Sequence, residues 1–401
     1  MSMFNVASSH PLIPNSNQYL LETKYVSINS QDRNITKYPN AATFEIELPQ
    51  DYLNVQSVKL YSWSLPLIHN VFSVFNHNRS MTFKFTTLYN PNDHVYVDPV
   101  QEDLQKGIYA ALTANLDKTY RIFIEDGFYH GANMATELTN QFNEVVTNTI
   151  MLFFTVTPAY VHLIPLFTAG YINFVVAYNS VEQKLWFGNT ADSFMLPNEI
   201  DAELQKEISV TQCLNRNVEP SFTNWGLPSY LGFNREPIES VSSVQNPRFY
   251  YEEGTDGYWL LPTLPGAKVS FLQAPLKINL VGPPYIYMEI DGLNCVDETS
   301  PYNLSKFTKH TNETNGIANS FFAKLPITNR LISQYFEEDY NGPYKWYYPP
   351  AERIRKLKIK FRHHNGQLID FGAQEYSFLL EFTLFRPQNL RETTIQHAHT
   401  K

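Results

Sequence analysis

The sequence predicts a mainly β protein, built from antiparallel β-sandwich or jelly-roll modules with one inserted amphipathic helix at about residues 131–147. Short segments in which apolar and polar residues alternate recur along the chain, and 25 prolines interrupt it. Alternation at every second residue buries one face of a strand, whereas a spacing of 3.6 residues buries one face of a helix. Because strands and helices do not alternate regularly, an α/β fold is not expected.

Strands and turns dominate the first 130 residues. The alternation is clearest at residues 44–48 (FEIEL) and 81–86 (MTFKFT), and residues 29–34 (NSQDRN) are typical of a turn. Residues 90–117 are polar and are expected to form an exposed excursion before a further strand and turn. The expected strands are residues 24–28, 43–48, 55–63, 81–86 and 120–127.

One segment has helical periodicity. Starting from Met134, apolar side chains recur at Leu138, Phe142, Val145 and Val146. Asn133 suits the N-cap position, because its side chain can accept a hydrogen bond from a backbone N–H group of the first turn. The helix is expected to pack its apolar stripe on the sheet.

Residues 145–181 contain no Asp, Glu, Lys or Arg. Within them, residues 150–169 are about as long as the roughly 20-residue helix that spans a bilayer. Prolines and polar residues interrupt this stretch, and its β-branched residues favour two buried strands joined through the prolines. Two alternatives stay open, which are a transmembrane helix and an apolar patch that contacts a membrane or a partner.

A hairpin follows, with strands at residues 171–178 and 183–188 joined by a turn at Asn179-Ser180. Residues 189–219 are polar and are expected to be looped or partly helical. The second half is expected to contain long loops at residues 297–314 and 337–350. Its strands are expected at residues 274–281, 285–290, 320–325, 353–362 and 376–384.

Length and composition indicate two β modules flanked by terminal segments. The 401 residues exceed the usual ~100–200 residues of one domain, and 43% of them are hydrophobic, enough for a sizeable core. The predicted division is an N-terminal arm at residues 1–23, a first β module at 24–235 that contains the helix, a second β module at 236–387 and a C-terminal tail at 388–401.

The composition is also that of a protein with extensive interfaces. Aromatic residues make up 15% of the chain, whereas charged residues are only 17%, below the roughly 25% of typical soluble domains. Tyrosine, present 26 times, is preferred at interfaces because its apolar ring carries a hydrogen-bonding tip. A large aromatic core would explain these numbers equally well. The net charge of −9 disfavours a surface that wraps nucleic acid.

No pattern of residues predicts catalysis, a cofactor or a metal site. The two cysteines, Cys213 and Cys295, are too few and too far apart for a disulfide scaffold or a zinc site of four cysteines. Motifs for phosphate loops, nucleophile elbows and zinc helices are missing. The one conceivable metal set combines His69, His77, Asp93 and His94. The chain is predicted not to be an enzyme and to act on no small-molecule substrate.

The strongest candidate site is a cationic ribbon at the end of a predicted strand. Period-two geometry places Leu357, Ile359 and Phe361 on one face of this strand. The opposite face carries four cations, which are Lys356, Lys358, Lys360 and Arg362. Lysines of this kind also protect edge strands from unwanted pairing, and a cationic face can bind phosphate. Docking to an acidic protein neighbour is the functional interpretation, with these four residues as the partner interface.

The opening of the chain is similar to a known group of viral proteins. Residues 25–33 (YVSINSQDR), followed by 37–40 (KYPN) and 44–49 (FEIELP), resemble the start of minor capsid proteins of nucleocytoplasmic large DNA viruses, particularly of the chlorella-virus kind. The resemblance extends from about residue 24 to residue 384. Further similar segments are residues 122–142, 231–233 (LGF), 285–290 (YIYMEI), 320–327 (SFFAKLPI) and Phe361 with 370–372 (DFG).

This resemblance implies a structural role in the virion without catalytic residues. The implied function is that of a minor capsid protein that cements or links major capsid protein assemblies on the inner side of a large icosahedral shell. The expected partners are the major capsid protein and other minor capsid proteins, with residues 150–169 as a contact to the inner viral membrane. Assembly would take place in the host cytoplasm.

Two alternatives to the cementing role stay open. One is a penton protein that closes the vertices of the shell. The other, less favoured, is a carbohydrate-binding or hydrolytic β protein of the virion, in which exposed tryptophans would line a sugar groove. The tryptophans considered for this groove are Trp225, Trp259 and Trp346.

Overall fold

The protein forms two compact units. The computed structural model describes residues 19–66, 70–74, 76–202, 206, 225–243, 247–250, 256–298, 319–327, 335–339, 342–364, 366 and 368–387. Within them the chain is mainly β, and its strands pair in antiparallel fashion, as the sequence predicts. Unit 1 lies within residues 1–69 and 283–401, and unit 2 lies within residues 70–282.

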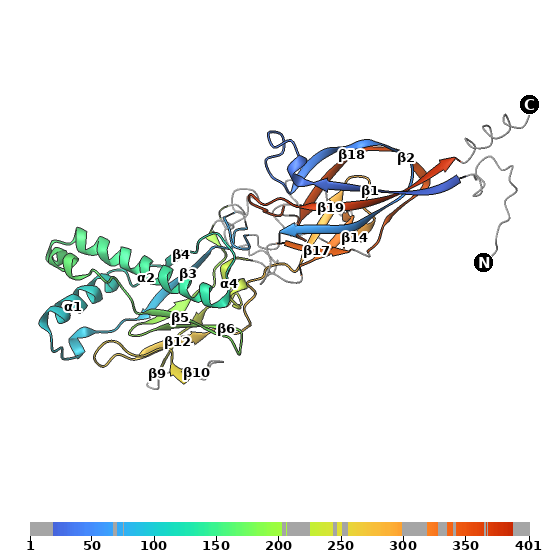
Figure 1. Ribbon diagram of the computed structural model, residues 1–401. Helices are drawn as coiled ribbons and strands as arrows, with labels where there is room; N and C mark the ends of the chain where they lie inside the picture. Colours follow the sequence, from blue (N-terminus) through green and yellow to red (C-terminus); the bar gives the residue numbers. More distant parts are fainter. Residues whose placement is uncertain are drawn as a thin grey trace, which may run out of the picture. The chain divides into compact units, whose positions relative to one another are not determined.

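Unit 1 is a curled sheet built from both ends of the chain (Figure 1). Its strands follow the order β1-β19-β2-β18-β13-β16, β17 also pairs with β2, and β14 pairs with β15. The strands are β1 (Tyr19–Asn29), β2 (Thr43–Pro66), β13 (Tyr285–Ile290), β14 (Val296–Glu298), β15 (Asn319–Phe321), β16 (Ala323–Pro326), β17 (Tyr335–Asp339), β18 (Lys345–Arg362) and β19 (Ser377–Pro387). A short 3-10 helix, η2 (Ser30–Asp32), follows β1.

Strand β2 is the centre of this sheet. It runs for 24 residues and pairs with β19 and with β18, which both come from the other end of the chain. Alternate side chains of these strands point into a core that belongs to unit 1 alone. Buried members of this core include Phe44, Val58, Ile290, Phe361 and Phe382.

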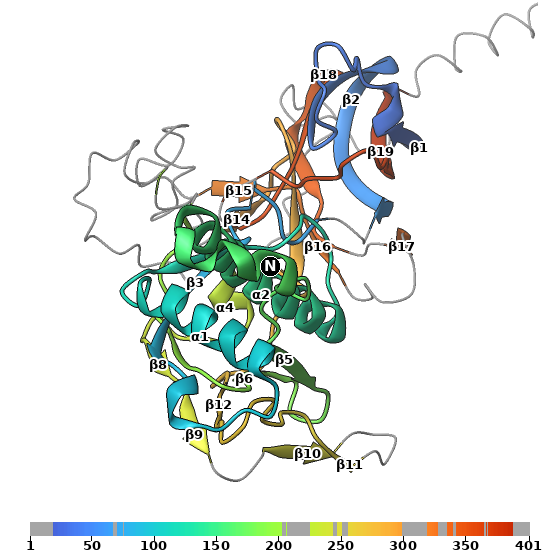
Figure 2. The ribbon, with the colours of Figure 1, turned by 90° about the vertical axis from the view of Figure 1, so that its left-hand side faces the viewer.

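Unit 2 combines small sheets with helices (Figure 2). Its sheets have the orders β4-β3-β7-β8, β5-β6-β12-β9 and β10-β11. The strands are β3 (Ser80–Thr87), β4 (Tyr120–Phe123), β5 (Phe174–Asn179), β6 (Lys184–Asn189), β7 (Ser193–Leu196), β8 (Ile238–Glu239), β9 (Val241–Ser243), β10 (Arg248–Tyr250), β11 (Asp256–Tyr258) and β12 (Val269–Gln273). The helices are η3 (Pro91–Asp93), α1 (Pro99–Thr113), α2 (Gly131–Val156), η4 (Pro158–Leu166) and α4 (Leu227–Tyr230).

Helix α2 packs its apolar stripe on the core of unit 2, as predicted, but it continues to Val156. Ile150 and Phe154 extend the stripe at helical spacing, so the helix does not end at residue 147. The helix begins directly after His130, and Asn133 is therefore not its N-cap. Asn143 fixes the helix to β5, because its side chain donates to the carbonyl of Phe174 at 2.9 Å and accepts from the N–H of Phe174 at 3.0 Å.

Two other segments are helical where the sequence predicts other structure. Helix α1 forms inside the polar stretch at residues 90–117, with Asp98 accepting from the N–H of Val100 at 2.9 Å and Pro99 at the first helical position. Residues 150–169 form the end of α2 and η4 instead of two buried strands. The apolar positions 146, 150 and 154 continue the helical period across the expected break. None of the helices in the described part of the chain combines the length and the hydropathy needed to cross a bilayer.

The units also divide the chain differently from the predicted modules. The boundary expected between residues 235 and 236 lies inside unit 2, because β12 pairs with both β6 and β9. Residues 19–23 of the predicted arm at residues 1–23 belong to β1, which pairs with β19 from Tyr19 onward. Residues 1–18 and the predicted tail at 388–401 lie outside the described residues.

Several local predictions can be compared with the structure. The predicted hairpin is confirmed as β5 and β6, with Phe174 opposite Asn189. No strand forms at residues 274–281, because β12 ends at Gln273. The loop expected at 337–350 instead contains the end of β17 and the start of β18, and most of the loop expected at 297–314 lies outside the described residues.

The core of unit 2 predicts a large effect for one ring. Phe142 is fully buried, and its ring stacks on Phe83 with centroids 4.7 Å apart. Replacing Phe142 by Ala should lower the free energy of unfolding by about 3–5 kcal/mol. The matched control is Phe123→Ala, since Phe123 is 41% exposed, and it should cost less than about 1 kcal/mol. Urea denaturation followed by circular dichroism measures both, and equal losses would contradict the assignment of Phe142 to the core.

Candidate functional site

The second half of β18 carries the predicted cationic ribbon. Leu357, Ile359 and Phe361 are buried, whereas Lys356 and Lys358 are exposed, so the predicted alternation of the two faces is confirmed there. The interpretation as a protected edge strand is wrong. Strand β18 lies between β2 and β13, and it pairs with both of them.

Acidic side chains on the flanking strands neutralise the lysines of the ribbon. Lys356 Nζ lies 3.4 Å from carboxylate oxygens of both Glu45 and Glu47 on β2. Hydrogen bonds from the Lys356 ammonium to these two carboxylates raise its pKa. Lys358 Nζ lies 3.5 Å from Asp291, which follows β13.

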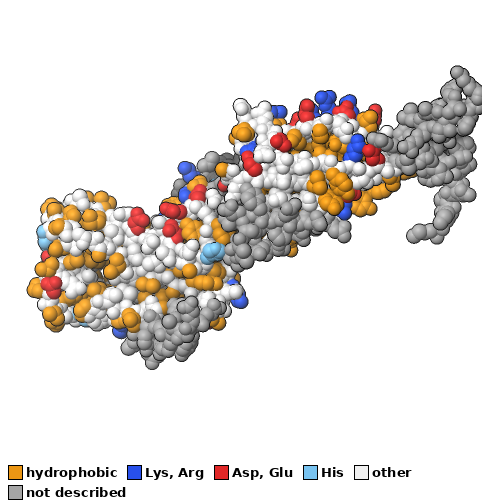
Figure 3. All heavy atoms as spheres, in the orientation of Figure 1, with side chains coloured by type: hydrophobic (Ala, Val, Ile, Leu, Met, Phe, Trp, Pro, Cys, Tyr) orange, Lys and Arg blue, Asp and Glu red, His pale blue; other side chains and the backbone are white. Residues whose placement is uncertain are grey.

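The sign of the charges changes from one strand to the next, from acidic on β2 to basic on β18 and acidic again at β13. We call these side chains the charged ladder: Glu45, Glu47, Lys356, Lys358, Lys360, Glu289 and Asp291. Lys360 joins it through Glu289, with Nζ and Oε2 3.4 Å apart. Figure 3 shows Lys, Arg, Asp and Glu side chains interspersed on unit 1. The predicted ribbon is therefore part of a balanced surface of both signs.

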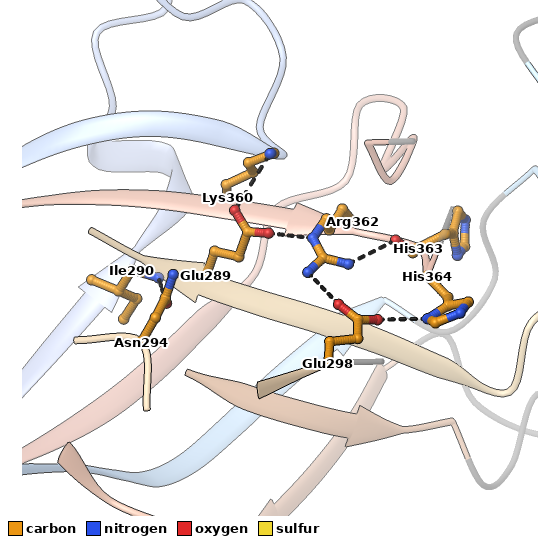
Figure 4. A network of polar contacts seen from close by, with 8 residues as sticks. All are labelled: Glu289, Ile290, Asn294, Glu298, Lys360, Arg362, His363 and His364. Carbon is orange, nitrogen blue, oxygen red and sulfur yellow. Dashed lines mark hydrogen bonds and ion pairs between the residues drawn. The ribbon is translucent and has the colours of Figure 1, made fainter. Parts of the chain in front are cut away.

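Arg362, the last cation of the predicted ribbon, is completely buried (Figure 4). Its guanidinium donates to Glu289, to Glu298 Oε2 at 2.7 Å and to the carbonyl of His363 at 3.2 Å. The second oxygen of Glu298 lies 2.6 Å from Nδ1 of His364. This Arg362 network is internal to unit 1, so Arg362 is not presented to a partner as predicted.

Tyr287 of β13 lines the same network. It stands opposite Arg362 in the register of β13 and β18, and the guanidinium carbon lies 5.2 Å from the centre of its ring. Burial raises the pKa of the Tyr287 hydroxyl, Glu298 raises it further, and the charge of Arg362 opposes both effects. Carboxylates and an aromatic face together compensate the loss of water around the buried guanidinium.

The first half of β18 exposes aromatic side chains from a segment that was predicted to be a loop, and Trp346 was considered there only for a sugar groove. Tyr344, just before the strand, and Trp346 and Tyr348 within it are 50%, 54% and 85% exposed. We call these three residues the aromatic row. Between them, Tyr347 packs against the core of unit 1 and donates from its hydroxyl to the carbonyl of Gly292 at 2.9 Å. The sequence pattern that indicates this strand is the spacing of Tyr344, Trp346 and Tyr348 at every second residue. It lies in the segment at 337–350, which is rich in proline and tyrosine and was predicted to be a loop.

The aromatic row shares its sheet face with other exposed rings. Four neighbouring strands carry residues at the same level of the sheet. They are Trp346 on β18, Ser57 on β2, Thr383 on β19 and Thr23 on the edge strand β1. Tyr25, two residues after Thr23, points to the same face and contacts the ring of Tyr61 edge-on with centroids 5.2 Å apart. The outer face of unit 1 thus presents aromatic rings at the first half of β18 and the charged ladder at its second half.

Neither the sugar groove nor the metal site considered from the sequence is supported by the described residues. Trp225 is buried in unit 2, where Arg235 covers its ring, and it cannot line an open groove. Of the considered metal ligands, His94 stacks on Tyr89, and His69 lies outside the described residues. Among the residues that the structure describes, no three His, Cys, Asp or Glu side chains are grouped so that they could hold a metal ion.

Comparison with known proteins gives one sequence relative. No family model matches the chain. The chain is similar to penton capsid protein P1 of Paramecium bursaria Chlorella virus 1, with 28% identity over 123 residues. The predicted resemblance to capsid proteins of large DNA viruses is confirmed. The match covers 28% of this chain and 63% of the relative, which is less than two thirds of its length.

Two solved structures are also similar over most of the chain. One is a chain of the Sputnik virophage solved by cryo-electron microscopy, with a TM-score of 0.39 and 13% identity over 90% of this chain and 98% of that one. The other is the mavirus penton protein, with a TM-score of 0.40 and 8% identity over 92% of this chain and 100% of that one. Because both TM-scores lie below 0.5, these two likenesses carry no argument about function.

The Arg362 network predicts a difference between two cations of the same strand. Arg362→Met removes the buried cation that Glu289 and Glu298 share, and it should lower the free energy of unfolding by about 3–5 kcal/mol. The control is Lys358→Met, because the Lys358 side chain is 60% exposed. This substitution should lower the free energy of unfolding by less than about 1 kcal/mol. Urea denaturation of both variants measures the difference. Equal stability of the two variants would show that Arg362 is not an internal anchor.

Proposed function

We propose that this chain is a non-enzymatic structural protein of a virus capsid and that it occupies the vertices of the shell, as a penton protein. The observation that carries the proposal is its similarity to penton capsid protein P1. The motifs near residues 25–49, which resemble minor capsid proteins of large DNA viruses, support the capsid role but do not distinguish the vertex from the inner side of the shell. The virion is accordingly its proposed location, and other capsid proteins, including the major capsid protein, are its proposed partners.

The outer face of unit 1 is the surface that we propose for contacts between subunits. Exposed Tyr and Trp side chains are the residue types that contribute most at protein interfaces, and the aromatic row together with Tyr25 and Tyr61 supplies them. Copies around a fivefold axis contact one another head to tail, so this face of one copy would pack against a different surface of the next copy.

The charged ladder is proposed to select the partner and not to provide most of the affinity. Lys356 and Lys358 remain exposed beside Glu45, Glu47 and Asp291, so an approaching surface meets both signs of charge. Charges at the rim of an interface steer association and reject partners with the wrong pattern, whereas desolvated rings contribute more binding energy. Arg362 is buried and is left out of this proposal.

Cementing of the inner shell surface is the second candidate role. The low content of charged residues, 17% of the chain, suits any protein whose surface is largely covered after assembly, and it does not distinguish the two roles. The named relative is a penton protein, which is why the vertex is the preferred position.

The oligomeric state of the purified protein tests the vertex role. We expect a ring of five copies, of about 232 kDa, which is five times the 46.4 kDa of one chain. Native mass spectrometry measures the mass, and negative-stain electron microscopy shows the symmetry. Particles of one or two copies at every concentration tested would contradict the vertex role and would favour cementing.

The aromatic row provides a second test. Replacing Trp346 and Tyr348 together by Ser should weaken ring formation by about tenfold or more, because these side chains would lose their burial against the neighbouring copy. The matched control is Ile35→Ser in unit 1, since Ile35 is 61% exposed and lies in the turn between η2 and β2, outside the strands of the sheet. Mass photometry over a dilution series measures the fraction of rings. Equal dissociation of the double variant and the control would remove the aromatic row from the interface.

A further inference from the structure

The outer edge of β1 is a row of backbone groups that no described strand covers. Among the strands that the structure describes, β1 pairs with β19 alone and forms one margin of the sheet of unit 1 (Figure 2). The N–H of Ser30 donates to the carbonyl of Tyr376 at 2.8 Å and continues this ladder, so the even-numbered residues of β1 face β19. The odd-numbered residues direct their N–H and C=O groups away from the sheet. We call these groups the open edge, and they belong to Leu21, Thr23, Tyr25 and Ser27.

Strand β1 lacks the features that usually protect an edge strand. Such strands are commonly kept from pairing by proline, by a bulge, by short length or by an unpaired charge. The strand runs for 11 residues without proline, and its register with β19 is unbroken from Tyr19 to Asn29. Its two charged residues, Glu22 and Lys24, lie 3.9 Å apart and pair with each other. The open edge is therefore available to an added strand.

A comparable edge in unit 2 is covered by side chains. Strand β5 also ends its sheet, and α2 lies along its other side. Thr139 of α2 accepts a hydrogen bond from the N–H of Val176 at 2.9 Å, and Asn143 bonds both backbone groups of Phe174. No described residue forms such a bond with the open edge of β1. The open edge thus lacks the side-chain cover that α2 gives to β5.

We propose that the open edge of β1 binds an extended strand formed by residues 388–401 of a neighbouring copy of this chain. A row of alternating N–H and C=O groups is matched by another extended backbone, and main-chain hydrogen bonds provide the affinity of such contacts. Residues 388–401 are longer than the 11 residues of β1 and contain neither proline nor glycine. Their β-branched residues Thr393, Thr394 and Ile395 favour a strand. The inference rests on the proposed ring and names the segment that joins its copies.

Other strands fit the open edge less well. Residues 1–18 contain Pro11 and Pro14, which have no N–H group to donate to a ladder. Pairing of β1 with β1 of a second copy is twofold symmetric and does not produce a ring of five. Residues 388–401 of the same copy leave β19 at Pro387, opposite Tyr19, and they have no glycine or proline for a tight reversal along their own β1.

Photocrosslinking of the full-length protein tests this inference. A photoreactive p-benzoylphenylalanine replaces Tyr25, and copies with and without heavy-isotope labels are mixed while dissociated and then concentrated. We expect the crosslink to join this position to the tryptic peptide that follows Arg391, residues 392–401, in hybrids of labelled and unlabelled copies. Mass spectrometry identifies both the peptide and its copy. The matched control carries the same group at Ile35, outside the strands of the sheet, and should not capture this peptide.

Proline variants provide a second measurement. Thr23→Pro removes one N–H group of the open edge and keeps the bonds to β19, because proline is tolerated where the N–H faces away from a sheet. It should raise the concentration at which half of the rings dissociate by about tenfold, whereas Thr23→Val keeps the N–H and should leave it unchanged. Joint replacement of Thr393 and Thr394 by Pro should act like Thr23→Pro, since one of two successive N–H groups faces β1 in any register. Mass photometry measures dissociation, and circular dichroism verifies folding.

Three outcomes would overturn the inference. The first is a ring of five copies in which position 25 captures residues 1–18, another β1 or no other copy, and the vertex role would then stand without this contact. The second is capture of residues 392–401 from the same copy alone. The third is equal dissociation of folded Thr23→Pro and Thr23→Val. If native mass spectrometry shows no ring of five, the vertex role fails, and a hybrid crosslink to residues 392–401 would still confirm the strand addition itself.

Discussion

The antiparallel pairing of β2 with β18 and β19 is the constraint on which unit 1 depends. These strands come from opposite ends of the chain, and their pairing forms a sheet that curls around a core to which both ends contribute. Unit 2 is inserted between β2 and β13 and has a core of its own. Long-range pairing of this kind has a high entropic cost of closure, which the buried faces of three long strands offset.

The same pairing decides what the cations of β18 can do. A lysine on an edge strand faces water on one side, whereas Lys356, Lys358 and Lys360 lie between strands that carry Glu and Asp at neighbouring positions. The result is a balanced ladder of charges, and at its end the sheet buries Arg362 with two carboxylates. A cation count along one strand therefore overestimates the charge that a partner meets, because the flanking strands are part of the same surface.

Local patterns predicted those parts of the fold that depend on neighbours in sequence. Alternation identified the strand at 285–290 and the hairpin of β5 and β6, and helical spacing identified most of α2. The division into units was not predictable in this way, because it follows from pairings between the two chain ends. The burial of Arg362 was missed for the same reason, since Glu289 and Glu298 are separated from it by more than 60 residues. The aromatic row was missed because prolines beside it indicated a loop.

A curled sheet built from both ends of the chain, with aromatic rings outside and a separate inserted unit, suits a subunit that is held by its neighbours in a shell. Cryo-electron microscopy of particles that contain the chain is the most direct test of this role. The vertex role predicts density for the chain around the fivefold axes, with the rings of Trp346 and Tyr348 buried between adjacent copies. Density only beneath the faces of the shell, between major capsid proteins, would contradict the vertex role and identify a cementing protein instead.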